Sequence, residues 1–207
     1  MASENGHRSG LLIDFGGVLT TSPFDSFRAF CQIEGLDPET IGRRFREDKG
    51  ARDLLIGLEE GTLPEEEFEA RFAEVLGVEA PNLIERLMGN SSPEPAMLDA
   101  VRRARAAGIR TGLISNSWGI SRYDRAQLAE LFDGVVLSGE VGMRKPAREI
   151  YEMGARSIEL TPERCVFVDD LPFNLKPAQE LGMATVHHTD VEETIAELER
   201  LLGVALR

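Results

Sequence analysis

The strongest constraint on the fold of this chain is an alternation of short apolar runs with helical patterns. Five runs have the length and composition of buried strands: Leu11–Phe15, Ile109–Ile114, Gly134–Leu137, Cys165–Val168 and Ala184–Val186. Helical periodicity surrounds the later runs, at Pro95–Ala107, Arg122–Phe132, Arg148–Ile158, Leu175–Leu181 and Val191–Leu202. Strands that alternate with helices pair in parallel, with helices on both faces of the sheet. We therefore expect an α/β fold with a Rossmann-like parallel sheet.

Residues 20–92 interrupt this alternation. They show no strand pattern, and Gly or Pro separates their helical stretches: Pro23–Glu34, Pro38–Arg46, Ala51–Leu58, Pro64–Leu76 and Pro81–Met88. We expect residues 20–92 to form an all-helical cap, inserted after the first strand of a core made of residues 1–19 and 93–207. The cap holds 16 Asp and Glu against 8 Lys and Arg. We expect these charges to be solvated helix faces rather than an acidic docking surface.

Glycine and proline mark the expected ends of several helices. Gly108 and Gly182 are placed as helix stops, because glycine readily adopts the left-handed conformation found there. Pro146 and Pro177 suit the first turn of a helix, where a missing N–H has no consequence.

The bulk properties exclude some classes of function. The 207-residue chain has a formal net charge of −13 and no basic cluster, which argues against nucleic acid or an anionic membrane surface as the main partner. No apolar run approaches the roughly 20 residues of a membrane span, and Met1–Ser9 lacks the apolar stretch of a signal peptide. Cys31 and Cys165 are expected to be reduced core thiols, which is typical of a cytoplasmic protein.

Acidic residues end two of the predicted strands. Asp14 ends the apolar run Leu11–Ile13 of the first strand, and the adjacent pair Asp169 and Asp170 follows the fourth. The carboxyl ends of parallel strands are where ligands bind. Two acidic strand ends can share Mg²⁺, which takes oxygen ligands and substrate phosphates. Ser115 and Lys145 lie between them in the sequence and add a hydroxyl and an ammonium group, so the set is suited to phosphoryl transfer.

Four motifs occur in order along the chain: Asp14-Phe15-Gly16-Gly17-Val18-Leu19, Ser115-Asn116, Lys145-Pro146 and Phe167-Val168-Asp169-Asp170. Together they resemble the four signatures of the haloacid dehalogenase superfamily. The chain is also similar to the subgroup that contains the N-terminal phosphatase domain of soluble epoxide hydrolase, around Ser115–Trp118, Val141–Pro146 and Asp169–Ala178. The resemblance covers essentially the whole chain, cap included. We expect no epoxide-hydrolysing domain, because the chain ends about where the phosphatase unit would.

The resemblance implies a phosphatase that acts on a small phosphorylated molecule. Asp14 would be the nucleophile and would form an aspartyl-phosphate that water then cleaves. Ser115 would bind a phosphoryl oxygen, with the backbone N–H of Asn116 beside it. Lys145 would neutralise charge on the same group in the transition state.

The resemblance also implies a Mg²⁺ site. Its ligands would be the carboxylates of Asp14 and Asp170 and the backbone carbonyl of Gly16, with Asp169 as a second ligand or a supporting acid. Asn174 would orient this acidic loop or cap the following helix, and capping is favoured.

Gly16 departs from the family pattern. Most phosphatases of the superfamily carry at this position a second Asp, which protonates the leaving oxygen and activates water, a contribution of about 10²–10⁴-fold in rate. Three interpretations stay open: substrates with good leaving groups, such as sugar 1-phosphates or acyl phosphates; a proton from a cap residue or ordered water; or a binding protein with little turnover. Dehalogenases of the superfamily also lack this Asp but need no metal, so the Asp169–Asp170 pair argues against dehalogenation.

Four other residues are candidates for the site. His7, His187 and His188 are the obvious substitute acids, although a plain strand-end role is favoured for His187 and His188. Trp118 follows the phosphate-binding turn, and either packs in the interior or lines the entrance to the substrate site.

Overall fold

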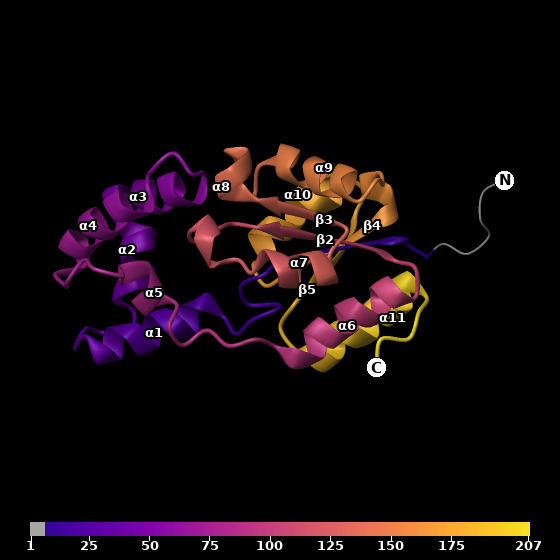
Figure 1. Ribbon diagram of the computed structural model, residues 1–207, viewed down its shortest axis with the longest axis horizontal. Helices are drawn as coiled ribbons and strands as arrows, with labels where there is room; N and C mark the ends of the chain where they lie inside the picture. The colour runs from indigo at the N-terminus through magenta and orange to yellow at the C-terminus, as the bar shows by residue number, and fades with distance from the viewer. Residues whose placement is uncertain (1–6) are drawn as a thin grey trace.

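The computed structural model describes residues 7–207 as a five-stranded sheet with helices on both faces and a group of helices at one end (Figure 1). The strands are β1 (Gly10–Ile13), β2 (Arg110–Ser115), β3 (Gly134–Leu137), β4 (Cys165–Asp169) and β5 (Ala184–His187). Their order is β3-β2-β1-β4-β5, and every neighbouring pair is parallel. The prediction of an α/β fold with a Rossmann-like parallel sheet is confirmed.

Helices cover both faces of the sheet because side chains alternate along each strand. One face packs against α6 (Pro95–Ala106), α7 (Arg125–Leu131) and α11 (Val191–Leu202), and the other against α9 (Arg148–Ser157) and α10 (Pro172–Glu180). Short helical turns complete the core: η1 (Ile120–Arg122), α8 (Ser138–Val141) and η2 (Pro162–Arg164). In β1, Leu11 and Ile13 face the first layer and Leu12 faces the second. All three are fully buried, so β1 is a rigid support for the residue that follows it.

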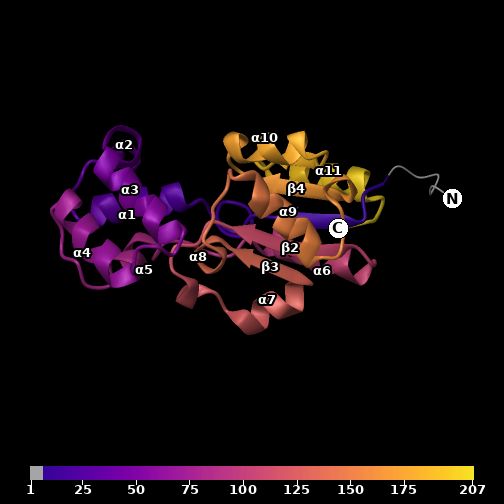
Figure 2. The ribbon, with the colours of Figure 1, turned by 90° about the horizontal axis from the view of Figure 1, so that it is seen from above.

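The helices of residues 20–92 pack on one another beyond the carboxyl ends of the strands (Figures 1 and 2). They are α1 (Pro23–Ile33), α2 (Thr40–Glu47), α3 (Lys49–Glu59), α4 (Glu65–Leu76) and α5 (Leu83–Leu87). We refer to this group as the cap. Its apolar side chains form a hydrophobic cluster of their own, which includes Phe27, Phe30, Phe68 and Phe72. The cap therefore has an interior that is distinct from the two layers around the sheet.

Two adjacent segments join the cap to the sheet. Thr20 and Pro93 form an isolated antiparallel bridge. The backbone N–H of Thr21 donates to the carbonyl of Ser92 at 2.9 Å, and the Ser92 N–H donates to the Thr21 hydroxyl at 3.1 Å. The chain thus enters and leaves the cap at one place, and the covalent connection is narrow.

Helix α10 differs from the prediction at its start. The pattern predicted Leu175–Leu181, whereas the helix spans Pro172–Glu180 and has Pro172 in its first turn. Pro177 lies inside the helix, where its missing N–H leaves the carbonyl of Phe173 without a helical partner. The first-turn prediction for Pro177 is wrong. It is also wrong for Pro146, which lies before the N-cap residue of α9.

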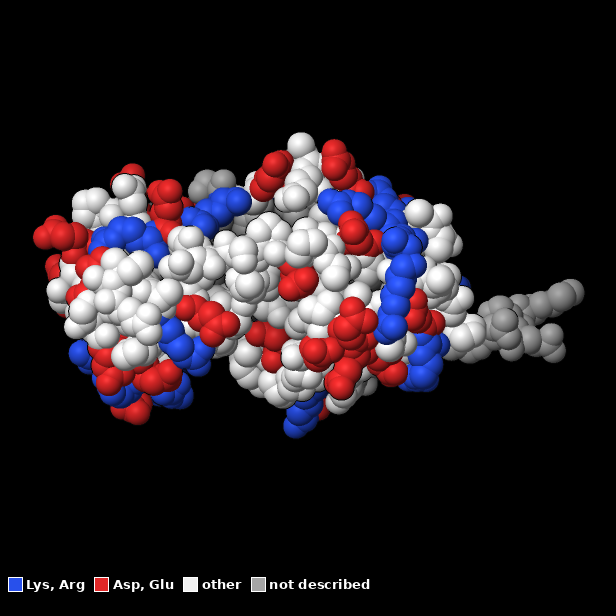
Figure 3. Space-filling model, turned by 90° about the horizontal axis from the view of Figure 1, so that it is seen from below, with Lys and Arg blue, Asp and Glu red and all other residues white. Residues whose placement is uncertain are grey.

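Other features of the described chain follow the sequence. Gly108 and Gly182 follow α6 and α10 with φ of +87° and +85°, as expected for helix stops. Cys31 and Cys165 are both buried free cysteines. None of the helices in residues 7–207 is both long and apolar enough to cross a membrane. Figure 3 shows acidic and basic side chains interspersed over the cap, with a larger group of acidic side chains over the core.

Candidate active site

Polar residues from three adjacent strands meet at the edge of the sheet that faces the cap. Asp14 directly follows β1, Ser115 ends β2 and Asp169 ends β4. Because β1 lies between β2 and β4 and all three run in the same direction, the three residues share one edge. The N–H of Asp14 donates to the carbonyl of Val168 at 2.9 Å, which keeps Asp14 in register with β4.

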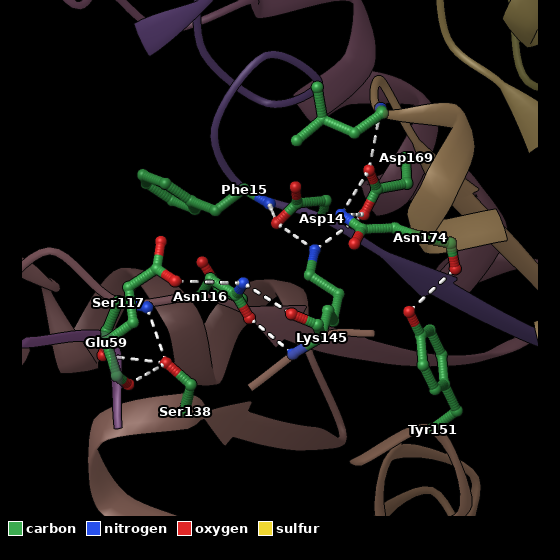
Figure 4. A network of polar contacts seen from close by, with 12 residues as sticks. Asp14, Phe15, Glu59, Asn116, Ser117, Ser138, Lys145, Tyr151, Asp169 and Asn174 are labelled. Atoms are coloured by element: carbon green, nitrogen blue, oxygen red, sulfur yellow. Dashed lines mark hydrogen bonds and ion pairs between the residues drawn. The ribbon is translucent and has the colours of Figure 1, made fainter. Parts of the chain in front are cut away.

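Lys145 supplies a buried cation to this site. Its Nζ lies 2.8 Å from Oδ1 of Asp14 and 2.7 Å from Oδ2 of Asp169 (Figure 4). It also lies 5.6 Å from the centroid of the Phe167 ring, a favourable cation–π distance. Although burial opposes the charged form, the two carboxylates raise the pKa of Lys145 above its ordinary value. Lys145 is therefore a fully buried ammonium group held between two acids.

Both oxygens of Asp169 accept hydrogen bonds from the chain. The Asn174 amide donates to Oδ1 at 3.0 Å and to Oδ2 at 3.1 Å, and the Leu171 N–H donates to Oδ1 at 2.9 Å. The Tyr151 hydroxyl in turn donates to the Asn174 carbonyl at 2.7 Å. Asp169 thus anchors both Lys145 and the start of α10. Because Asn174 lies inside α10, the favoured capping role is wrong, and its contacts fit the alternative of orienting the acidic loop.

Asp14, Asp169 and Asp170 form a cluster that fits a divalent cation. One carboxylate oxygen from each lies within 4.8 Å of the others. Burial raises the pKa of Asp14 to about 8 against the opposing effect of Lys145. Burial and repulsion by Asp169 raise the pKa of Asp170 to about 6. A cation would offset both effects. In addition, the buried Oδ1 of Asn174 has no hydrogen-bond partner within residues 7–207, so a further oxygen is available beside the cluster.

The two glycines that follow Phe15 face different neighbours. Gly17 has a φ of +77°, and a Cβ atom there would lie 2.4 Å from Oδ2 of Asp170. Glycine is required at this position by both the backbone conformation and the close approach of Asp170. A Cβ atom at Gly16 would lie 3.0 Å from Cγ of Pro23, the first residue of α1. Position 16 therefore presents only backbone to the site, opposite an apolar ring of the cap.

The loop after β2 positions a hydroxyl group and the backbone of Lys145. Ser115 Oγ lies 2.9 Å from the hydroxyl of Tyr123. Burial raises the pKa of Tyr123, so the phenol stays protonated and can donate to Ser115. Asn116 bonds to the Lys145 backbone twice: its Oδ1 accepts from the N–H at 2.8 Å, and its Nδ2 donates to the carbonyl at 3.2 Å. One loop thus places both Ser115 and Lys145.

Glu59, the last residue of α3, is a site residue that the sequence did not reveal. Its Oε2 accepts from Nδ2 of Asn116 at 3.4 Å and pairs with Nε of Arg144 at 2.5 Å. Its backbone carbonyl accepts from the hydroxyl of Ser138. Glu59 is only 5% exposed, and burial raises its pKa to about 7 while Arg144 opposes the shift. The expectation that the cap charges are solvated is therefore wrong at Glu59.

A cavity of about 550 Å³ lies between the cap and the strand ends. Asp14, Ser115, Lys145 and Asp170 all line it. Apolar and aromatic side chains from cap and core make up much of its remaining wall, among them Phe24, Phe27, Phe45, Ile56, Trp118 and Phe173. The volume is typical of a site for a small organic molecule.

Trp118 has a packing role and also lies on the wall of the cavity. It belongs to the core chain but packs into the aromatic cluster of the cap, with ring centroids 5.1 Å from Phe27 and 5.9 Å from Phe68. It also lines the cavity.

The histidines are not among the cavity-lining residues in the described part of the chain. Nε2 of His187 donates to the backbone carbonyl of Asp170 at 3.0 Å. Nδ1 of His188 lies 2.9 Å from the hydroxyl of Thr194. His7 is exposed. These contacts agree with the strand-end role that was favoured for His187 and His188.

Comparisons with known proteins agree with this geometry. A family model described as haloacid dehalogenase-like hydrolase matches residues 9–182. Bifunctional epoxide hydrolase 2 of Sus scrofa is 38% identical over 117 residues, which cover 53% of this chain and 21% of that protein. The sesquiterpene phosphatase astK of Aspergillus oryzae is 33% identical over 133 residues, which cover 61% of this chain and 66% of that protein. The chain thus matches only about a fifth of the length of the porcine relative.

A solved structure extends the comparison to nearly the whole chain. It is a HAD-family enzyme from Bacteroides thetaiotaomicron, in complex with magnesium and inorganic phosphate. Its sequence is 25% identical, its TM-score is 0.64, and the alignment covers 87% of this chain and 93% of that one.

Proposed function

Because this chain belongs to the haloacid dehalogenase-like hydrolases, we propose that it hydrolyses a phosphomonoester in a Mg²⁺-dependent reaction through a phosphorylated Asp14. The observation that carries the proposal is the contact of Asp14 with the buried ammonium of Lys145, 2.8 Å away, beside two further acids and on the wall of a cavity. A carboxylate in this position can attack phosphorus while a fixed cation neutralises the phosphoryl oxygens.

Each residue of the site has a separate role in the proposed reaction. Oδ1 of Asp14 accepts from Lys145 and from the N–H of Phe15, so Oδ2 is the oxygen that attacks phosphorus. The Ser115 hydroxyl, held by Tyr123, binds a phosphoryl oxygen together with the backbone N–H of Asn116. Water then cleaves the aspartyl-phosphate and restores the free carboxylate.

The acidic cluster is where we place the metal. Asp14, Asp170 and the carbonyl of Gly16 would hold Mg²⁺, with Asp169 behind them as the anchor of Lys145. When bound, Mg²⁺ neutralises the phosphoryl group and the cluster of acids.

We propose that the alcohol part of the substrate is apolar. The cavity wall beyond the acids carries aromatic rings such as Phe27, Phe45 and Trp118, which favour a hydrocarbon body over a sugar. The name of the fungal relative, a sesquiterpene phosphatase, supports the same class of substrate.

The test is phosphate release from farnesyl phosphate, p-nitrophenyl phosphate, acetyl phosphate and glucose 6-phosphate, with Mg²⁺ or with EDTA. We expect Mg²⁺-dependent turnover, with kcat/KM for farnesyl phosphate at least about 10-fold above that for glucose 6-phosphate, because an apolar body gains burial in the cavity. Asp14→Asn should abolish turnover on every substrate and leave the circular dichroism spectrum unchanged.

Other outcomes would point to other functions. No metal-dependent turnover on any of these substrates would favour a phosphate-binding protein. Halide release from a 2-haloacid in EDTA would favour dehalogenase chemistry. Faster turnover of glucose 6-phosphate than of farnesyl phosphate would overturn the apolar substrate class alone.

A further inference from the structure

The cavity holds one carboxyl group outside the acidic cluster, and the site lacks an acid at Gly16. Among the cavity-lining residues of the described chain, the acids are Asp14, Asp170 and Glu59. We propose that Glu59 is the general acid and base of this site, and that it supplies from the cap the proton transfer that position 16 cannot provide. This inference rests on the proposed phosphatase function.

The contacts of Glu59 fix its carboxyl group beside the phosphate-binding loop. Its Oε2 is held by Asn116 and Arg144, which immediately follow Ser115 and precede Lys145 in the chain. Figure 4 shows the carboxyl group turned toward Asn116, with its other oxygen outside the marked contacts. The series Glu59–Asn116–Lys145 therefore reaches the nucleophile through direct contacts.

The backbone around Glu59 lies in close contact with the core. The carbonyl of Glu59 accepts from the Ser138 hydroxyl. Gly61, with a φ of +67°, lies so close to Gly139 that a Cβ atom would be 2.3 Å from the Gly139 carbonyl oxygen. Glycine allows this approach of the two backbones. The cap can thus deliver a carboxyl group to the strand ends with a defined position.

The surroundings of Glu59 suit a group that must both give and take a proton. Burial raises its pKa to about 7, while the nearby cations Arg144 and Lys145 oppose the shift and Glu60, the C-cap residue of α3, adds to it. Both protonation states are therefore populated near neutral pH, where general acid–base catalysis is most effective. Burial raises the pKa of Tyr123, and Asp14 and Glu59 add to the shift, so Tyr123 stays protonated and bonds to Ser115.

The proposed reaction has two steps. Oδ2 of Asp14 forms a bond to phosphorus, the bond from phosphorus to the alcohol oxygen breaks, and protonated Glu59 gives its proton to that oxygen, which leaves as the alcohol. Water then attacks phosphorus, ionised Glu59 takes its proton, and the bond from phosphorus to Asp14 breaks. The products are inorganic phosphate, free Asp14 and protonated Glu59.

A merely structural role for Glu59, as a link between cap and core, makes a different prediction. Loss of a link slows every substrate alike, because it loosens the whole site. Loss of an acid slows substrates with poor leaving groups most, because a departing alkoxide needs the proton and a nitrophenolate does not.

The experiment compares Glu59→Gln with Glu60→Gln, a neighbouring acid that does not line the cavity. With saturating Mg²⁺, we expect Glu59→Gln to lower kcat/KM for n-octyl phosphate by about 10²–10⁴-fold and to lower kcat/KM for p-nitrophenyl phosphate much less. For p-nitrophenyl phosphate it should leave a burst of one equivalent of nitrophenolate, because phosphorylation proceeds and hydrolysis of the aspartyl-phosphate is slowed. The limb near pH 7 in the wild-type rate profile should disappear. Glu60→Gln should resemble wild type on both substrates and keep the limb, moved slightly to lower pH because Glu60 helps to raise the pKa of Glu59.

Glu59→Asp keeps the carboxyl group and guards against a variant that is inactive for structural reasons; it should retain the limb near pH 7. Equal losses of kcat/KM, which reports the phosphorylation step alone, on both substrates, or an unchanged pH profile in Glu59→Gln, would overturn the role of Glu59 while leaving the phosphatase function intact. A wild-type protein without Mg²⁺-dependent turnover would overturn both.

Discussion

Replacement of Lys145 by Met should destabilise the protein far more than replacement of an exposed lysine. The methionine preserves most of the volume but leaves Asp14 and Asp169 without the ammonium group that lies 2.8 and 2.7 Å from them. Removal of one partner from a buried ion pair typically lowers the free energy of unfolding by about 3–5 kcal/mol. That is a large share of the roughly 5–15 kcal/mol available to a typical domain.

The loss should grow with pH. Burial already raises the pKa of Asp14 to about 8 with the lysine present. A folded-state pKa above the unfolded value means that stability is complete at low pH and declines as the pH rises through the folded value. Without the lysine the pKa of Asp14 in the folded protein rises further, so the free energy of unfolding declines more as the pH rises. We expect a loss of about 3 kcal/mol at pH 6 that approaches about 5 kcal/mol at pH 9 in EDTA, and partial recovery with Mg²⁺.

Urea unfolding followed by circular dichroism measures this loss directly. The matched control is Lys176→Met. The Lys176 side chain is 79% exposed, and its ion pair with Glu180 is long, at 4.0 Å. The control should lose no more than about 0.5 kcal/mol. A loss for Lys145→Met that equals the control, or that is larger at pH 6 than at pH 9, would refute the account of Lys145 as a buried counter-ion.

Three further changes test the site. Gly17→Ala should lower the free energy of unfolding by about 1–3 kcal/mol and weaken Mg²⁺ binding at least about 10-fold in calorimetry. The reason is that the Cβ atom of the alanine would lie 2.4 Å from Oδ2 of Asp170. An unchanged Mg²⁺ affinity would contradict this prediction. In the Glu59→Gln background, where Glu59 no longer supplies the proton, Gly16→Asp should speed n-octyl phosphate hydrolysis more than p-nitrophenyl phosphate hydrolysis at saturating Mg²⁺, provided that Pro23 yields by a few tenths of an ångström. Equal effects on the two substrates would show that position 16 is not a lost acid. The pKa of Glu59 is about 7 in the folded protein and 4.5 in the unfolded chain. The free energy of unfolding of wild type, relative to Glu59→Gln, should therefore fall by about 3 kcal/mol between pH 4.5 and pH 8 in urea titrations. A difference in unfolding free energy that does not change with pH would argue against this pKa.

The sheet could be predicted from the sequence because its strands are short, mostly apolar runs, and the central ones, β1 and β4, are buried throughout. Leu11, Leu12 and Ile13 are fully buried, and such runs have no amphipathic alternative. The acids at the ends of β1 and β4 could be placed at one edge for the same reason. Their separation and the ion pairs of Lys145 could not, since these depend on side-chain positions in three dimensions.

The start of α10 was missed because Leu171-Pro172-Phe173 has the composition of a loop. Local hydrogen bonds accompany this start: the Leu171 N–H and the Asn174 amide both donate to Asp169, which holds the segment at the first turn of the helix from Pro172 onward. Because the helix begins at Pro172, Asn174 and Pro177 lie inside it, and the roles predicted for them at its start are wrong.

Glu59 could not be found from sequence for a different reason. It is one of many acids in the cap, and no spacing distinguishes it from its neighbours. Its partners, Asn116 and Arg144, are 57 or more positions away in the chain. Only the contact between cap and core makes this residue part of the site.

The placement of Trp118 gives the protein an intrinsic optical reporter. It is the only tryptophan of the chain, and it extends from the core loop into the phenylalanine cluster of the cap. Separation of the cap from the strand ends would transfer the indole from an aromatic to an aqueous environment and shift its fluorescence emission to longer wavelength. Movement of the cap during a catalytic cycle can therefore be followed in stopped-flow experiments on the unlabelled protein.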